Sequence, residues 1–341
     1  MIKRLYLNKL SFLLSFIIYV VSFYFITYNS DWVGYEYRFN NTEHSSDIMF
    51  YFLSNLLNSR GYEFIVLYKI HIILAGFLYS YFVSKISAKG YRLIIFVILL
   101  NYVALGNMIR YYVAFPSFLC SLLFLYEKKY FKHILFAIFA LLNHTAIIGA
   151  YIALYTSLLI TSRIKRNPSG NIMLLNVAVF LSVEFATAIL GSHFLAYLED
   201  EMQSSIIGGL YNIFPGTVIL VLLISLYNAV KKRDQQLYAS RLFTIFFIAC
   251  VSSYVYLLPS LSVQILANRY ISPMLIFIIS FMLLCLINTS SAYIKKKIKK
   301  SISIIVILTL FWEYGASLLI LRSAVVYDEL RIMLTSMLIN N

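Results

Sequence analysis

An apolar segment of 27 residues, positions 134 to 160, limits most strongly how this chain can fold. Only Asn143, His144 and Thr145 interrupt it, and basic loops at 128–132 and 163–166 flank it. As one straight helix it would be roughly 40 Å long, more than a hydrocarbon core of about 30 Å. Because basic flanks favour the cytoplasmic side of a membrane, both ends belong on the same side. The segment therefore predicts a re-entrant or broken helical hairpin with His144 at or near its apex.

The composition extends this interpretation to the whole chain. Of its 341 residues, 61% are hydrophobic and 12% are charged, which is typical of a polytopic membrane protein. No polar block is large enough for a separate domain, so we expect one integral membrane domain over residues 1–341. The apolar runs predict an all-α protein with about nine full spans, at about 8–27, 64–84, 93–109, 111–126, 171–190, 212–230, 242–262, 271–289 and 301–321.

The positive charge is a signal of membrane topology. Most of the 28 lysines and arginines lie in alternate short loops between the expected spans, which predicts a cytoplasmic N-terminus and an uncleaved first span. If 134–160 crossed the membrane once, the basic loops at 163–166, 231–241 and 295–300 would lie on the wrong side. The net charge of +14 therefore implies no nucleic-acid partner.

The first external loop, residues 28–63, is polar, acidic and aromatic. Within it, the run from Ile48 to Leu57 is apolar but too short to span a membrane, so we expect a short interfacial or re-entrant helix. Residues 322–341 are expected to form an external amphipathic tail.

Two arginines are placed at the external ends of spans. Arg110 falls at a tight turn between two spans, and Arg269 opens a late span. Guanidinium groups make planar, bidentate contacts with phosphate oxygens, so the pair suits a lipid-linked pyrophosphate. Alternatively, each arginine anchors its span at the level of the lipid headgroups.

His144 falls at a depth where polar side chains are costly and tend to be functional. A neutral imidazole there could accept a proton from a hydroxyl group or donate a hydrogen bond to a phosphate. Alternatively, it satisfies backbone groups that the turn leaves without partners. Asn143 and Thr145 are expected to serve the turn.

The external loop also supplies carboxylates and aromatic rings. A carboxylate could act as a general base or orient sugar hydroxyls, or simply be a solvated loop charge. The neighbouring rings could stack on sugars, although an interfacial aromatic belt explains them equally well. The candidates are Asp31, Glu36 and Asp47 for the carboxylates and Trp32, Tyr35 and Tyr37 for the rings.

Metal-ligating patterns are missing from the sequence. The three cysteines lie inside apolar runs, and no HExxH, DxD or phosphate-loop motif occurs. We therefore expect no metal and no cofactor.

Several of these positions together resemble the EpsG-like and Wzy-type polysaccharide polymerases, which include O-antigen polymerases. The family has an Asp-x3-Tyr pattern after the first span, an acidic residue before a short amphipathic segment, an Arg-x3-Ala start to a span, a His-x-Ala motif and a late Arg beside a Tyr. The matching positions are Asp31 and Tyr35, Asp47, Arg110 and Ala114, His144 and Ala146, and Arg269 and Tyr270. The chain departs from the pattern at Tyr111, where Gln is common, and at Ser121 and Ser280, where some Wzy proteins have Gly.

The resemblance implies a glycosyltransferase of GT-C-like architecture in the bacterial inner membrane, active on the periplasmic face. Such an enzyme joins undecaprenyl-pyrophosphate-linked repeat units into O-antigen, capsular or exopolysaccharide, without a metal. Arg110 and Arg269 would hold the donor pyrophosphate, and His144 or a carboxylate among Asp31, Glu36 and Asp47 would take the proton of the acceptor hydroxyl. Expected partners are the lipid-linked glycans and the bilayer, and a chain-length regulator protein is a further candidate.

Two other functions are compatible with the sequence. Charged residues within spans (Lys69, Glu184 and Glu313) and a broken hairpin would suit a flippase or exporter of lipid-linked oligosaccharide, although no internal repeat is present. The other is an O-antigen ligase, which would move a finished glycan to another acceptor.

Overall fold

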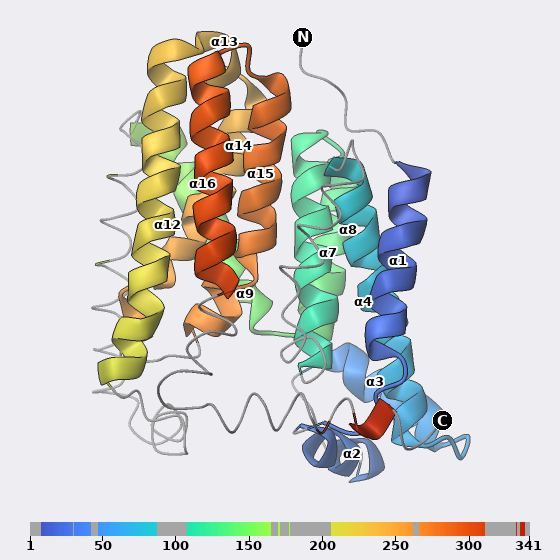
Figure 1. Ribbon diagram of the computed structural model, residues 1–341. Coiled ribbons are helices and arrows are strands. Elements are labelled where there is room, and N and C mark those ends of the chain that lie inside the picture. The colour runs from blue at the N-terminus through green and yellow to red at the C-terminus, as the bar shows by residue number, and fades with distance from the viewer. Residues whose placement is uncertain are drawn as a thin grey trace. The chain divides into compact units, whose positions relative to one another are not determined.

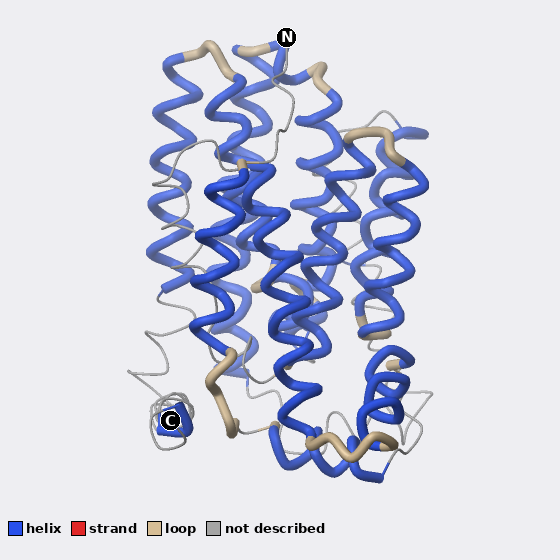
Figure 2. The backbone as a smooth tube through the Cα atoms, turned by 90° about the vertical axis from the view of Figure 1, so that its right-hand side faces the viewer, coloured by secondary structure: helices blue, strands red, loops and turns tan. Residues whose placement is uncertain are grey.

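The computed structural model describes residues 8–29, 31–41, 47–86, 108–164, 170, 177, 206–261, 266–310, 332 and 335–337. Within these residues all regular structure is helical, as the sequence predicted (Figures 1 and 2). The contacts divide the chain into two compact units. We call Arg4–Ile148 with Glu313–Asn341 the N-terminal unit, and Gly149–Trp312 with Met1–Lys3 the C-terminal unit. The expectation of a single membrane domain remains a prediction.

Four helices of the described part are long and apolar enough to cross a membrane: Phe64–Ile86, Ile109–Tyr126, Ile213–Arg233 and Arg269–Asn288. Several shorter apolar helices accompany them. The predicted spans at 93–109 and 171–190 lie almost entirely outside the described residues, as do Glu184 and Glu313. The number of nine spans and the GT-C-like architecture therefore remain predictions.

The N-terminal unit is built around α7 (Ile109–Tyr126), which is buried along almost its whole length. It packs against α4 (Phe64–Ile86) and α8 (Tyr130–Asn143), and α1 (Lys9–Phe23) covers α4 (Figure 1). Gly76 allows the close approach of α1, because a Cβ atom there would lie 2.9 Å from a ring carbon of Tyr19. The unit thus holds the start of α7, where Arg110 lies, against its neighbours.

The outer faces of α1 and α8 are apolar. Ile17 and Val21 on α1, and Phe131 and Leu135 on α8, are all exposed. A water-soluble protein rarely exposes such contiguous apolar surface. These faces fit contact with lipid, in agreement with the composition.

Two short helices lie within residues 28–63, the loop that the sequence predicts to be external. The expected apolar helix is α3 (Ile48–Asn58), which is too short to span. The sequence analysis missed α2 (Trp32–Asn41), whose Trp32, Tyr35 and Phe39 are buried. Their spacing of three and four residues places them on one face of a helix. Gly34 and the polar residues between them conceal that pattern in a scan for apolar runs.

The C-terminal unit contains α12 (Ile206–Arg233), α13 (Gln235–Tyr238), α14 (Arg241–Ser252), α15 (Met274–Asn288) and α16 (Ala292–Leu310). Helix α15 is buried and contacts α14 and α16, and α16 also packs against α12 (Figure 1). The lysines at 295–300, expected in a loop before a span at 301–321, lie in the first turns of α16. Lysine is a good helix former, and Ile294 and Ile298 are buried beneath it, so the helix begins before the apolar run.

The break predicted inside 134–160 is present. Helix α8 ends at Asn143, and α9 (Ile147–Ile164) begins after three residues. The Ile147 amide donates to the His144 carbonyl oxygen (3.2 Å), and the Ile148 amide to that of Thr145 (3.0 Å). The polar triplet thus forms the turn at which the helix is interrupted. The boundary between the two units follows Ile148, so the return of α9 along α8 remains a prediction.

Candidate active site

A buried carboxylate, Asp47, organises the candidate site in the N-terminal unit. It precedes α3 at the N-cap position with an extended backbone (φ −97°, ψ 91°), but its side chain does not cap that helix. The carboxylate is turned towards α7 and towards the break between α8 and α9, and only 1% of the side chain is exposed. A carboxylate of this burial requires several donors, because an unpaired buried charge is strongly unfavourable.

Three residues supply those donors. Arg110 donates from Nη1 to Oδ2 of Asp47 (2.6 Å), and Nδ1 of His144 lies 2.9 Å from the same oxygen. The other oxygen, Oδ1, accepts from the backbone amide of Thr145 at 2.9 Å, with the Thr145 hydroxyl at 3.4 Å. One carboxylate therefore connects the beginning of α7 with the turn that follows α8.

Aromatic rings fix the guanidinium of Arg110. Its Cζ atom lies 5.0 Å from the ring centre of Tyr35 and 5.2 Å from that of Phe50. Cations within about 6 Å of such ring centres are attracted to them, and α2 and α3 each contribute one ring. The side chain of Arg110 is 12% exposed. The orientation of the guanidinium therefore depends on α2 and α3 as well as on Asp47.

His144 is the C-cap residue of α8 and has an extended backbone (φ −156°, ψ 116°). Its ring meets the Tyr111 ring edge to face, with centres 5.6 Å apart and planes at 87°. With Nδ1 occupied by Asp47, the neutral tautomer that donates there carries an unprotonated Nε2. That nitrogen is the one that could accept a proton from a substrate, with the Asp47 carboxylate stabilising the resulting imidazolium.

The electrostatics differ among the acidic and phenolic groups of the loop. Burial acts to raise the pKa of Asp47, but the hydrogen bond with His144, the charge of His144 in its imidazolium form, the charge of Arg110 and the Thr145 amide outweigh it and lower that pKa. Partial burial raises the pKa of Asp31, against the charges of Arg110 and Arg38. The lowered value keeps Asp47 ionised, so it suits the holding of His144 and Arg110 better than the acceptance of a substrate proton.

The aromatic candidates Trp32 and Tyr35 are both buried. Trp32 is buried between Phe64 and Tyr68, with ring centres 4.8 and 5.1 Å away, and so holds α2 on α4. Tyr35 is also buried, and burial raises its pKa against the charge and hydrogen bond of Arg110.

Three candidates of the loop face outwards. Asp31, Glu36 and Tyr37 are exposed, and 58% of Tyr37 is accessible. Of the three candidate sugar-stacking rings, Tyr37 is therefore the one that offers a free face.

Arg269 belongs to the C-terminal unit, in a π-helical turn, η3 (Ala267–Ile271). Its neighbour Tyr270 stacks on Tyr256 with ring centres 4.2 Å apart, and the Tyr256 hydroxyl donates to the Gly149 carbonyl oxygen at 2.9 Å. The buried Nε atom of Arg269 has no hydrogen-bond partner among the described residues. Short π-helical segments occur frequently at functional sites. The proximity of Arg269 and Arg110 remains a prediction.

Within the described residues, no three His, Cys, Asp or Glu side chains are grouped as metal ligands. The sequence analysis placed Asp47, Arg110 and His144 in one proposed site but did not predict that Asp47 contacts the other two directly. It also missed Phe50 and Tyr111 as supports. The contact between Asp47 and His144 was difficult to predict, because 97 positions separate the two residues in the sequence.

A comparison with protein families identifies the chain. The sequence profile of the EpsG family matches residues 9–322, which include all the candidate site residues. The chain belongs to the EpsG family. Membership in EpsG indicates a polysaccharide polymerase-type role for this membrane protein. Comparisons of this EpsG chain with curated proteins and with solved structures gave no match.

Proposed function

We propose that this EpsG protein polymerises undecaprenyl-pyrophosphate-linked oligosaccharide repeat units on the periplasmic face of the bacterial inner membrane. The observation that carries the proposal is the Asp47 carboxylate, which holds Arg110 and His144 together in a chain of this family. A buried Asp–His pair is a known means of preparing a general base, and an adjacent guanidinium suits a phosphate group.

In the proposed reaction, a sugar hydroxyl of one repeat unit attacks the anomeric carbon of the growing glycan. The new glycosidic bond forms as the bond between that carbon and the pyrophosphate oxygen breaks. The electron pair leaves with undecaprenyl pyrophosphate, and the hydroxyl proton passes to Nε2 of His144. Asp47 stabilises the imidazolium, as its hydrogen bond to Nδ1 would allow.

Arg110 is proposed to contact the pyrophosphate through its guanidinium, whose planar geometry and permanent charge match phosphate oxygens. Charge on the leaving oxygens grows as the bond breaks, so a fixed cation there stabilises the transition state more than the ground state. Arg269 is retained as the second pyrophosphate ligand predicted from the sequence. The exposed Asp31, Glu36 and Tyr37 are left as candidate contacts to the acceptor sugar.

Complementation of a host strain that lacks this protein tests the proposal. Asp47→Asn, Arg110→Ala and His144→Ala, at wild-type membrane levels, are expected to leave single repeat units in place of long glycan chains. Glu63→Gln and Arg60→Ala are the matched controls, because both residues are exposed in the same external loop, and they should restore long chains.

The glycan profile of the strain without the protein also distinguishes the other functions. Loss of a polymerase leaves single repeat units attached to the acceptor, and loss of a flippase leaves none. Loss of a ligase leaves lipid-linked polymer unattached. Long chains in all three site variants would refute the role of the cluster, and either of the last two profiles would refute polymerisation.

A further inference from the structure

A dense basic surface lies at one end of the C-terminal unit, where α12 ends and α16 begins. Helix α12 ends in Lys231, Lys232 and Arg233. Helix α16, which packs against α12, has five lysines in its first turns. Six of these lysines define what we call the lysine surface: Lys231, Lys232, Lys295, Lys296, Lys299 and Lys300, all of which are exposed.

Side-chain contacts hold the two basic turns together. The guanidinium of Arg233 lies 4.0 Å from the ring centre of Tyr293, in the first turn of α16. The next residue, Asp234, accepts from the Thr289 hydroxyl at 2.6 Å and from the Leu237 amide at 2.9 Å. The Asp234 carboxylate therefore stabilises the fold and is not directed at a lysine.

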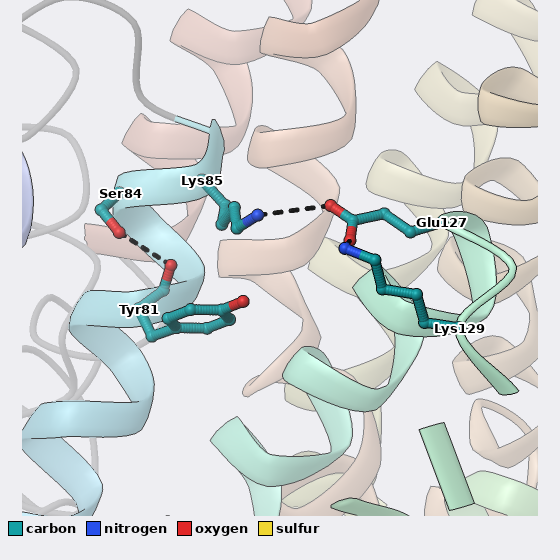
Figure 3. Close-up of polar contacts among 5 residues, drawn as sticks. All are labelled: Tyr81, Ser84, Lys85, Glu127 and Lys129. Atoms are coloured by element: carbon teal, nitrogen blue, oxygen red, sulfur yellow. Dashed lines mark hydrogen bonds and ion pairs between the residues drawn. The ribbon is translucent and has the colours of Figure 1, made fainter. Parts of the chain in front are cut away.

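The basic turn between α7 and α8, in the N-terminal unit, provides a contrast. There Glu127 accepts from Lys85 at 3.4 Å and from Lys129 at 2.6 Å (Figure 3). Among the described residues, no lysine of the lysine surface forms a salt bridge. In the part of the chain that the structure describes, lysines at the α7–α8 turn thus have a carboxylate partner, whereas those of the lysine surface do not.

The fold prevents the lysines from moving apart. Lys295 and Lys299, and likewise Lys296 and Lys300, are four residues apart on one helix, where like charges repel. Burial of Ile298 on the opposite side fixes the helix about its axis. An anion bound between these lysines would relieve the repulsion, so the surface has a physical preference for a negatively charged partner.

The location of the lysine surface at the end of a candidate span indicates which anions lie near it. The stretch Ile213–Arg233 is a candidate span that ends in the basic residues of α12. In α16 the lysines lead directly into an apolar run, whose Ile307 is 66% exposed. Lysines at the end of a span lie at the depth of lipid headgroups, where clustered basic residues attract anionic lipids.

We propose that the lysine surface is a binding site for the phosphate headgroups of anionic phospholipids in the adjacent leaflet, which the topology predicts to be cytoplasmic. The site goes beyond the proposed polymerase function and does not depend on it. Binding there would fix the ends of α12 and α16 against each other through the shared headgroup.

Lipid retention by the purified full-length protein tests this. The protein is exposed to equimolar phosphatidylglycerol and phosphatidylcholine in detergent, and the retained lipids are counted by native mass spectrometry. The wild type should retain phosphatidylglycerol preferentially. At roughly fivefold in affinity per lysine, Lys296→Gln, Lys299→Gln and Lys300→Gln together should lower that preference by roughly 100-fold.

The matched control removes three exposed charges from the other turn: Lys128→Gln, Lys129→Gln and Lys132→Gln. The control should keep the preference within about twofold, and arginine at positions 296, 299 and 300 should preserve it. Equal retention of the two lipids by the wild type would overturn the proposal without any variant. An equal loss in the control, or no loss in the triple glutamine variant, would also overturn it.

Discussion

Replacing Asp47 by asparagine removes one negative charge and almost no volume. The three donors around the carboxylate stay in place. An asparagine oxygen can still accept from the Thr145 amide, but its NH2 group then faces Nη1 of Arg110 and Nδ1 of His144. The guanidinium would face another donor and lose its buried counter-charge, and His144 would no longer be held in the tautomer that donates from Nδ1.

The expected loss of stability follows from burial. The side chains of Asp47, Arg110 and His144 are 1%, 12% and 15% exposed, so solvent screens the cluster little. Removal of one partner from a buried ion pair costs about 3–5 kcal/mol. The N-terminal unit of the asparagine variant should therefore unfold about 5 °C or more below the wild type. Polymerisation should fall by about 100-fold or more, because His144 loses the group that orients it.

The assay combines thermal unfolding of the purified protein with glycan chain length in the complemented strain. A double-mutant cycle adds Arg110→Gln, alone and together with Asp47→Asn. Because the two side chains share one ion pair, the double variant should be more stable than the sum of the single effects predicts, by about 1–3 kcal/mol. Wild-type chain length and stability in Asp47→Asn, or strictly additive effects in the cycle, would refute the reasoning.

The other predictions concern pH, the choice of cation and helix packing. The pKa of Asp47 is lower in the folded protein than in the unfolded chain. Asp47 therefore stabilises the fold above a pH of about 4, and this stabilisation is lost as the pH falls through the lowered pKa. Acid unfolding curves should show the loss in the wild type but not in Asp47→Asn. Arg110→Lys keeps the charge but not the planar fork, so glycan gels should show short chains at near-normal protein levels. In Gly149→Ala the added Cβ would lie 2.6 Å from the Tyr270 hydroxyl oxygen, so the free energy of unfolding should fall by about 1–3 kcal/mol. In Gly34→Ala the added Cβ would have nothing within 4 Å, so thermal unfolding should show no loss of stability.

Local patterns in the sequence predicted the local features of the fold. The break at Asn143–Thr145 and the short helix α3 follow from the lengths of apolar runs, because a membrane fixes how long a spanning helix must be. Helix α2 and the early start of α16 were missed for the opposite reason. Their apolar faces are spread among polar or lysine residues, and burial by neighbouring helices decides that they form.

The candidate site could be predicted only in part. His144 was singled out because a polar group at membrane depth requires a reason. Arg110 was singled out because a guanidinium at the end of a span suits a phosphate group. Their link through Asp47 depends on how the external loop docks on α7 and α8, which no spacing in the sequence encodes. Asp47 also occupies a position where a helix cap would be expected, and its actual partners lie far away in the chain.

Reconstitution of the reaction tests the central claim most directly. Purified wild-type protein in lipid vesicles, supplied only with undecaprenyl-pyrophosphate-linked repeat units, should form long glycans and release undecaprenyl pyrophosphate, whereas His144→Ala at the same density should form almost none. Absence of polymer with the wild type, or equal polymer with His144→Ala, would contradict the account.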